Sequence, residues 1–325
     1  MRPLVARSLT AHAPTRLDFG GGWTDVPPYP EERGGFVCNI AIERRATVRV
    51  VASDPPHDLH GPLVAAACSH AGITNARISL TSDFPFGAGL GGSSAVGVAL
   101  AAALAHWNGE SRTLSELAES SRLVETRGLQ MAGGFQDHYA AAFGGALGLT
   151  FEDRVHVRQL AVSDETIAAL EARSVLLYTG ESRMSGETIT AVLNAYNHGT
   201  PHVMHSLEQM KRLAISMADS LEHGDIDTLG ALVGEHWTHQ RTLHPRISTP
   251  RIDAITESAY QAGALGLKAL GASGGGCVIV IAPANAVNRV AEAIAGFGEQ
   301  LEWRVARTGV VVRDDLPLSR DEVSG

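Results

Sequence analysis

A glycine-dense stretch constrains this chain more than any other feature. It runs Pro85-Phe86-Gly87-Ala88-Gly89-Leu90-Gly91-Gly92-Ser93-Ser94-Ala95, between a predicted strand at 77–83 and a predicted helix at 93–106. Glycines adopt positive φ and let the backbone approach a ligand, so successive N–H groups can converge on one anion beside the positive end of the helix. The stretch predicts a phosphate-binding loop whose two hydroxyls hold a cation or cap the helix.

Two other interpretations of this stretch remain open at this point. Gly87, Gly89 and Gly92 satisfy the G-x-G-x-x-G pattern of dinucleotide-binding turns, with Glu110 near the place of the acidic partner. An ordinary glycine-rich turn before a capped helix would look similar. A Walker loop is excluded because Ser93, not a lysine, follows the last glycine. The stretch therefore leaves two classes of enzyme open, an NAD(P)-binding oxidoreductase and an enzyme that binds a phosphate group in this loop.

Composition limits the partners. A chain of 325 residues with 44% hydrophobic and 19% charged residues is long enough for two packed domains. The net charge of −9 argues against a nucleic-acid or anionic-membrane surface, so local donors must bind any phosphate. We expect neither nucleic acid nor membrane as a partner.

The cysteines and the apolar pattern suggest a compartment. Cys38, Cys68 and Cys277 are odd in number and widely spaced, which is typical of reduced thiols. The sequence shows no secretion signal and no run of 18 apolar residues. We expect a cytoplasmic protein, and the oligomeric state stays open, a homodimer included.

The first half of the chain contains β-rich runs at 5–19, 35–42 and 46–51. Between the first two, three consecutive glycines at 20–22 predict a sharp turn that presents Arg16, Thr24 and Asp25. A surface hairpin with solvated charges would give the same pattern.

Two carboxylates stand on predicted helices. A helix at 113–127 begins with the capping box of Thr113 and Glu116, and Glu125 falls in its last turn, where an acid opposes the helix dipole. Glu125 is thus either solvated or a metal ligand. Asp137 lies in the first turn of a helix flanked by glycine pairs, where a simple dipole partner is equally typical.

The second half predicts an α+β arrangement. Helices are expected at 201–223, 225–242, 250–263 and 285–297, and strands at 146–151, 174–179, 278–281 and 301–306. Glu235, His236 and His239 share one helix face, but they lack a third ligand at suitable spacing, which favours ordinary surface histidines over a metal site. The tail from Leu316 onward is predicted to be disordered.

Three motifs together resemble those of the GHMP small-molecule kinases. They are Ala13-Pro14-Thr15-Arg16 through Thr24-Asp25, the loop at 85–95, and Lys268-Ala269-Leu270-Gly271-Ala272-Ser273-Gly274-Gly275-Gly276-Cys277. Within this superfamily, the segments 133–145, 177–183 and 262–268 resemble bacterial D-glycero-D-manno-heptose 7-phosphate kinases. Segment 21–28 is similar to fucokinases.

The resemblance implies an α+β two-domain GHMP kinase fold. Its N-terminal domain, at 1–165, would be ribosomal-protein-S5-domain-2-like and bind ATP. Its C-terminal substrate domain, at 166–325, would be ferredoxin-like, with the active site between the two. The implied reaction is transfer of phosphate from ATP, with Mg²⁺, to the anomeric hydroxyl of a sugar. A heptose 7-phosphate is favoured, L-fucose is the alternative, and a non-catalytic sensor is a further class.

The resemblance also assigns catalytic and nucleotide-binding roles. Backbone groups of Gly87, Gly89, Leu90, Gly91, Gly92, Ser93 and Ser94 would bind the ATP phosphates. Ser93 and Glu125 match the family's Mg²⁺ ligands, hard oxygen donors of the kind that Mg²⁺ prefers. Many members have a different arrangement of glycine and serine at 91–94, so Ser94 stays an alternative to Ser93. Asp137 resembles the catalytic aspartate and Arg16 the arginine that pairs with it.

The substrate would be bound by Thr24, Asp25, Arg183, Gly274 and Gly275. Carboxylates suit sugar hydroxyls because they accept two donors. A substrate that already carries phosphate needs fixed donors, for which forked arginines serve best. The candidates are Arg183 and Arg241, with Arg246 a weaker one.

Overall fold

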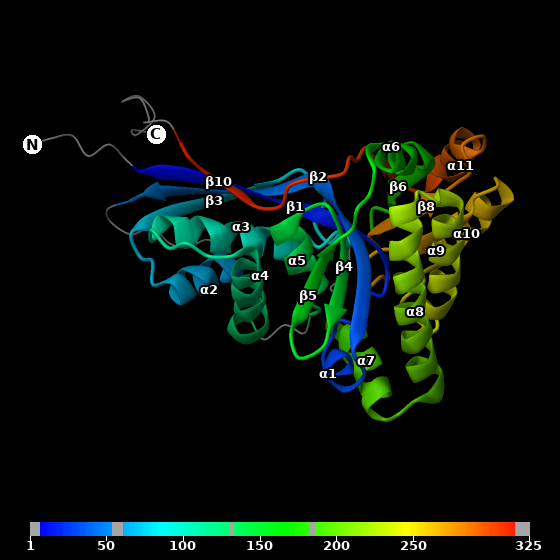
Figure 1. Ribbon diagram of the computed structural model, residues 1–325, viewed down its shortest axis with the longest axis horizontal. Coiled ribbons are helices and arrows are strands. Elements are labelled where there is room, and N and C mark those ends of the chain that lie inside the picture. Colours follow the sequence, from blue (N-terminus) through cyan, green and yellow to red (C-terminus); the bar gives the residue numbers. More distant parts are fainter. Residues whose placement is uncertain (1–6, 54–60, 130–132, 182–185, 316–325) are drawn as a thin grey trace, which may run out of the picture.

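The computed structural model describes residues 7–53, 61–129, 133–181 and 186–315. Arg183 and the tail from Leu316 lie outside these ranges. The described chain forms a six-stranded and a four-stranded sheet side by side (Figure 1). Every strand pair in them is antiparallel, which is not the parallel sheet of a dinucleotide-binding fold.

The first sheet has the strand order β10-β1-β2-β4-β5, with β3 also paired to β2. The predicted runs at 35–42 and 46–51 form one long strand, because its apolar residues continue through the bend. Between Pro14 and Thr15 the register of β1 against β2 shifts, which bends the sheet. The strands are β1 (Ser8–Gly20), β2 (Gly35–Ala52), β3 (Ala76–Ser82), β4 (Ala146–Phe151), β5 (Val155–Gln159) and β10 (Val311–Asp314).

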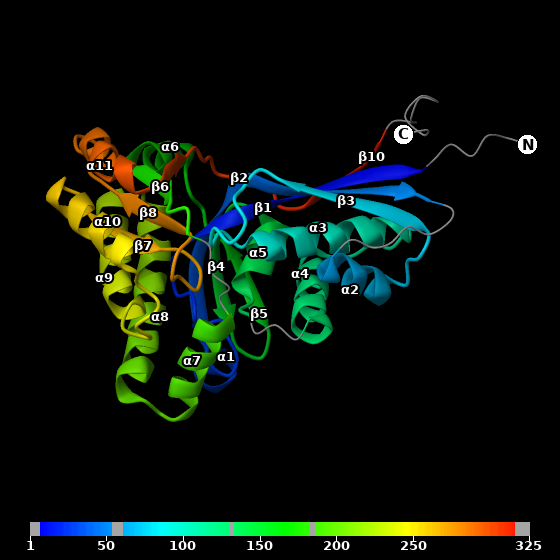
Figure 2. The ribbon, with the colours of Figure 1, turned by 180° about the vertical axis from the view of Figure 1, so that it is seen from behind.

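Four helices cover one face of this sheet, as the view from behind shows (Figure 2). The central one, α3, is lined with alanine, valine and leucine and is buried along most of its length, as its apolar sequence predicts. It packs in one core with Leu9 and Val48 of the sheet. The helices are α2 (Pro62–Ala71), α3 (Gly92–Trp107), α4 (Leu114–Leu123) and α5 (Gln136–Phe143).

The second sheet has the order β7-β8-β6-β9 and packs against long helices. Helix α8 begins at Pro201 and ends at His223, as predicted, because proline fits the first turn and Gly224 takes the left-handed conformation that ends it. The strands are β6 (Ser174–Tyr178), β7 (Gly266–Ala269), β8 (Cys277–Ile281) and β9 (Glu299–Leu301); the helices are α1 (Tyr29–Arg33), α6 (Asp164–Arg173), α7 (Gly186–Asn197), α8 (Pro201–His223), α9 (Ile226–Gln240), α10 (Pro250–Gln261) and α11 (Val287–Ile294).

The strand predicted at 301–306 is wrong in most of its length. Only Glu299–Leu301 is a strand of the second sheet; Val305 then forms a single bridge with Ile42 of the first. The chain crosses there from one sheet to the other and ends in β10, which pairs with β1. The division at residue 165 stays a prediction, and the first sheet takes its edge strand β10 from residues 311–314.

A shared core joins the two sheets. Leu17 and Phe19 of β1 pack with Met217 of α8 and Ile279 of β8 in one cluster. All three cysteines are buried free thiols, as their spacing predicts. Among the described residues, no helix is long and apolar enough to cross a membrane.

One buried ion pair also joins the sheets. The Nζ of Lys268 in β7 lies 3.0 Å from Oδ2 of Asp18 in β1 and donates to the Asp18 carbonyl at 2.9 Å. The side chains are 0% and 3% exposed. Charges this deep are tolerated only when they are paired, so each depends on the other.

Lys268→Met is expected to lower the free energy of unfolding by about 3–5 kcal/mol, because it leaves the Asp18 carboxylate buried without a counter-charge. Urea denaturation at pH 7 measures the loss. The matched control is Lys211→Met, which removes the chain's only other lysine from a more exposed pair with Glu208 and should cost under about 1 kcal/mol. Equal losses in the two variants would contradict the role of the buried pair.

Candidate active site

The glycine loop has the backbone that a phosphate site requires. Gly87, Gly89 and Gly91 have φ of 67°, 74° and 75°, and Gly91 is the N-cap of α3. No side chain caps α3, nor α1, α2, α5, α8 and α11, whereas side chains cap α4, α6, α9 and α10. The first N–H groups of α3 are therefore left for a ligand, together with the positive end of the helix dipole.

The glycine loop of the third motif closes against the first. The N–H of Cys277 donates to the carbonyl of Ala88 at 2.7 Å. A Cβ added to Gly89 would lie 2.6 Å from the carbonyl oxygen of Leu270, so only glycine allows this approach. Gly274 and Gly275 also have positive φ. The N–H of Gly274 donates to the carbonyl of Ile247, and a Cβ at Gly275 would lie 2.6 Å from the carbonyl oxygen of Glu181. The two loops thus form one surface built from both halves of the chain.

Asp137 and Arg16 meet at this surface. The Nε of Arg16 lies 2.7 Å from Oδ1 of Asp137, and its Nη1 donates to the carbonyl of Gly89 at 2.6 Å. Arg16 is 3% exposed and Asp137 26%. A Cβ on Gly91 would lie 3.1 Å from Oδ2 of Asp137, so the carboxylate touches the phosphate loop itself. Residues 121 positions apart in sequence form one charged pair at the loop.

Asp25 lies beside α5, the helix that carries Asp137. Its Oδ2 accepts the N–H of Gln136 at 3.0 Å, and any side chain at Gly134 would collide with its carboxylate. Thr24 has no hydroxyl to spare, since its Oγ1 donates to the carbonyl of Gly21 and accepts the N–H of Phe36. These bonds hold the turn that positions Asp25 and leave the Thr24 hydroxyl no hydrogen to donate to a sugar. A contact between Thr24 and a sugar stays a prediction.

Burial raises the pKa of Asp25 to about 7, helped by the negative charges of Asp137 and Asp18 and opposed by the N–H of Gln136. A carboxyl group whose pKa is raised this far, next to a charged pair, is a candidate functional residue.

Ser93 and Ser94 lie in the first turn of α3, and the side chain of Glu125 lies close to them. Hydrogen bonds from Ser93 and Ser94 reach the Glu125 carboxylate. Burial raises its pKa, but these bonds and the contact with His138 outweigh burial and leave the pKa below its ordinary value. Ser93 is exposed at the mouth of the loop whereas Ser94 is 4% exposed, which favours Ser93 as the ligand-facing hydroxyl.

The backbone at Glu125 departs from the predicted helix. Helix α4 ends at Leu123 and continues as a π-helical turn, Val124–Gly128, closed by the N–H of Leu129 on the carbonyl of Val124. Such turns re-aim side chains and are common at functional sites. The capping box of Thr113 and Glu116 is confirmed at the other end of α4.

Sequence reasoning missed several buried polar residues at the site. Lys268 was noted only as part of the third motif, although it pairs with Asp18, and His138 was not singled out. The expectation of surface histidines is wrong for His236, which is 0% exposed and accepts the N–H of Gly21 at 2.9 Å. The signal in the sequence was the helical spacing of His236 from the apolar residues Leu229 and Val233, which places it on the buried face of α9.

Two of the candidate phosphate-binding arginines are described, and neither touches the Arg16–Asp137 pair. Arg241 forms an ion pair with Asp253 at 2.9 Å. Asp253 also accepts from Ser248, next to Ile247, whose carbonyl is bonded to Ser273 of the third motif. Arg246 pairs with Glu187 on the surface.

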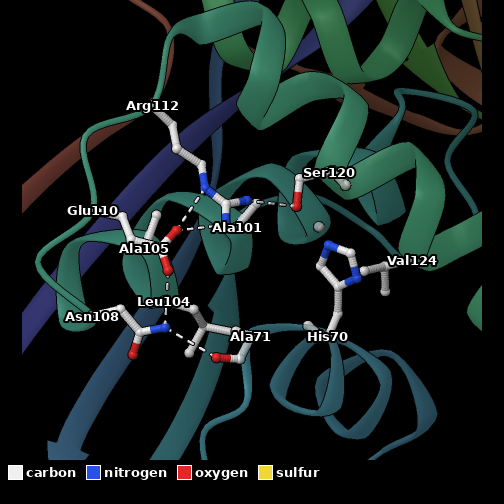
Figure 3. Close-up of a pocket in the computed structure, with 13 residues that line it drawn as sticks. His70, Ala71, Ala101, Leu104, Ala105, Asn108, Glu110, Arg112, Ser120 and Val124 are labelled. Atoms are coloured by element: carbon white, nitrogen blue, oxygen red, sulfur yellow. Dashed lines mark hydrogen bonds and ion pairs between the residues drawn. The ribbon is translucent and has the colours of Figure 1, made fainter.

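Away from these residues, a hollow lies between α2, α3 and α4 (Figure 3). Its polar groups satisfy one another: Arg112 is held by Glu110 and Ser120, and Asn108 donates to Ala71. It contains none of the predicted site residues. Within the described ranges, no cluster of three or more histidine, cysteine or acidic side chains could bind a metal alone.

An antiparallel two-sheet fold that brings a glycine loop at a helix N-terminus to a carboxylate–arginine pair suits an enzyme that transfers phosphate to a small molecule. Residues 60–145 match the GHMP kinases N terminal domain, and residues 217–300 match the GHMP kinases C terminal. The chain belongs to the GHMP kinase family. The fold and the enzyme class predicted from the sequence, an ATP-dependent kinase, are thereby confirmed.

Individual relatives agree with this family. The chain is 28% identical over 303 residues to the D-glycero-alpha-D-manno-heptose 7-phosphate kinase of Campylobacter jejuni, across 83% of this chain and 88% of that protein. It is 25% identical over 325 residues to the bifunctional fucokinase/GDP-fucose pyrophosphorylase of Arabidopsis thaliana, across 86% of this chain but only 30% of that protein's length.

Among solved structures, a D-glycero-D-manno-heptose 1-phosphate kinase from Bacteroides thetaiotaomicron superposes with a TM-score of 0.76 and 22% identity, over 95% of this chain and 99% of that one. At this identity the likeness shows the fold alone.

Asp25→Asn is expected to stabilise the protein increasingly as the pH rises. A carboxyl pKa raised from its ordinary value to about 7 means that folding favours the protonated form, so its contribution to stability is complete below pH 4 and is lost as the pH rises through 7. Between pH 5 and pH 8 the advantage of Asp25→Asn over wild type should grow by roughly 2 to 3 kcal/mol in urea denaturation. An advantage that does not change with pH would contradict the raised pKa.

Proposed function

We propose that this GHMP kinase is a sugar 1-kinase. It transfers the γ-phosphoryl group of ATP to the anomeric hydroxyl of D-glycero-D-manno-heptose 7-phosphate and forms the 1,7-bisphosphate. The observation that carries the proposal is the Asp137 carboxylate, which touches Gly91 of the phosphate loop on one side and Arg16 on the other.

Asp137 is placed to accept the proton of a sugar hydroxyl. Its Oδ1 is engaged by Arg16, while Oδ2 faces the glycine loop, where the γ-phosphate would lie. As the O–P bond forms and the bond to ADP breaks, the hydroxyl proton passes to Asp137. Arg16 then holds the carboxylate in place and offers positive charge to the transferring group. Most of the acceleration comes from positioning and electrostatics.

Ser93 and Glu125 fit a magnesium ion. They are hard oxygen donors; Ser93 lies in the first turn of α3, and its side chain interacts with the Glu125 carboxylate. Two protein ligands are enough for Mg²⁺ in such sites because substrate phosphates and water complete its shell, in agreement with the lack of a three-residue cluster in the described chain. When bound, the ion neutralises phosphate charge.

Asp25 is the proposed anchor for sugar hydroxyls. It is 1% exposed and lies next to Gln136, one residue from Asp137. Hydroxyl donors from a sugar would replace the solvation that burial removes and would favour the ionised carboxylate. A sugar bound there lies within reach of the reacting pair.

The choice of a heptose 7-phosphate is supported by similarity to the Campylobacter jejuni enzyme, which spans 88% of that protein. The fucokinase-type relative favours L-fucose as the second candidate, through similarity that includes 86% of this chain. For a phosphorylated substrate, Arg183 and Arg241 remain the proposed donors. Arg241 is linked to the third glycine loop through Asp253, Ser248 and Ile247.

ADP release with Mg·ATP across a sugar panel tests the substrate. The panel contains D-glycero-D-manno-heptose 7-phosphate, the free heptose, mannose, L-fucose and galactose, compared by kcat/KM. We expect the 7-phosphate to be preferred, and Arg241→Ala to raise its KM more than that of the free heptose. Preference for L-fucose would move the chain to the fucokinase-like branch, and the absence of turnover on every sugar would contradict the proposed substrate class.

Asp137→Asn tests the chemistry. We expect kcat to fall by about 10²–10⁴-fold while the Kd of ATP changes little, because the amide cannot accept the proton but occupies the same space. Stopped-flow or coupled assays give kcat, and calorimetry gives the Kd. Asp164→Asn, which removes an exposed carboxylate from a surface pair with Arg307, is the control. A near-normal kcat in Asp137→Asn would overturn the assigned role.

A further inference from the structure

His138 is the residue after the proposed base, and it is buried behind the proposed metal ligand. Its side chain is 2% exposed. Nε2 lies 3.1 Å from Oε2 of Glu125 and 3.4 Å from Oγ of Ser94, while Nδ1 lies 2.9 Å from Oγ of Ser121. One ring thus contacts three polar side chains from three different segments.

The partners fix the hydrogen positions on the ring. An ionised carboxylate only accepts, so Nε2 carries a proton and donates it to Glu125. In a neutral ring, Nδ1 then accepts the hydroxyl hydrogen of Ser121. Both ring nitrogens are satisfied, and the ring plane is set by two anchors on opposite sides.

The helix packing is built to allow this contact. A Cβ on Gly97 of α3 would collide with Oγ of Ser121, so glycine lets α4 approach α3 closely enough to bring Ser121 to His138. Gly97, Ser121 and Val124 also line the hollow between α2, α3 and α4. Glu125 lies four residues after Ser121, in the π-helical turn Val124–Gly128, which directs its side chain to His138.

The contact also separates the roles of the two serines. Ser94 is buried and lies within reach of His138, whereas Ser93 is exposed at the loop. His138 therefore engages Oε2 of Glu125 and contacts Ser94, whereas Ser93 stays exposed at the loop.

We propose that His138, held by Ser121, is a positioning residue that orients the Glu125 carboxylate for the magnesium ion of Mg·ATP. The inference rests on the proposed function, in that Glu125 is taken as a metal ligand. Metal ligands are oriented by hydrogen bonds from residues behind them, and loss of such a partner typically weakens metal affinity by about 10–100-fold. His138 acts through Glu125 and does not touch the substrate.

The experiment measures binding, not turnover. Calorimetry measures the Kd of the non-hydrolysable analogue AMP-PNP in excess Mg²⁺ and in EDTA. The ratio compared between variants is the Kd in EDTA divided by the Kd in Mg²⁺. His138→Leu should reduce this ratio about tenfold, with little change in EDTA. His138→Gln, whose amide can donate to Glu125, should retain most of the ratio. Tyr139→Phe is the matched control, because it removes a part-buried hydrogen bond to Glu119 from the next residue of α5.

A double mutant separates orientation from packing. If His138 acts through Glu125, Glu125→Gln alone should lower the ratio, and His138→Leu added to it should lower it no further. If His138→Leu fails to fold, Ser121→Ala removes only the anchoring hydroxyl and should reduce the ratio two- to threefold.

The outcomes separate two kinds of failure. A strong magnesium effect in wild type with an unchanged ratio in folded His138→Leu, or equal weakening in Mg²⁺ and EDTA, would overturn the role of His138 and leave the kinase assignment intact. Additive losses in the double mutant would do the same. A wild-type protein whose AMP-PNP affinity ignores Mg²⁺ would overturn the metal assignment of Glu125 and this inference with it.

Discussion

The buried pair of Lys268 and Asp18 is the interaction on which the arrangement of the site depends. It links β1, an interior strand of the first sheet, to the edge strand β7 of the second, where an unpaired charge would be expensive. Asp18 lies two residues from Arg16 in β1, so the two side chains project from the same face of the strand. The register that pairs Asp18 with Lys268 also points Arg16 toward α5.

The close approach of the two glycine loops follows from the same register. Lys268 lies two residues before Leu270, whose carbonyl sits over Gly89. The backbone N–H of Arg16 donates to the carbonyl of Leu90 at 3.0 Å, which ties the phosphate loop to β1. Three segments that are far apart in sequence are therefore fixed against one another by backbone contacts, and the approach of Leu270 to Gly89 is one that only glycine allows.

Much of this arrangement could be predicted from the sequence, because the signals were local. The glycine loop, the capping box at Thr113 and the limits of α8 each depend on residues within a few positions of one another. The pairing of Arg16 with Asp137 came from the resemblance to a family, not from spacing.

The buried polar contacts could not be predicted, because their meaning depends on partners far away in sequence. Lys268 is separated from Asp18 by 250 positions, and His236 from Gly21 by 215. Thr24 looks like an exposed polar residue until the fold brings Phe36 to it. The π-helical turn at Glu125 likewise has no sequence signal of its own, since it depends on how α4 packs.

Helix α5 shows how little chain the site needs once the fold is in place. Its first three residues point in successive directions, because each step along an α-helix turns the side chain by about 100°. At its first turn, the N–H of Gln136 holds Asp25, Asp137 meets Arg16 and the phosphate loop, and His138 meets Glu125. The proposed sugar anchor, the proposed base and the proposed metal ligand are thus all held by the first turn of α5, and a displacement of α5 would move all three together. This shared support explains why the glycines at 134 and 91 must stay small: both lie where the side chains held by this turn approach the backbone.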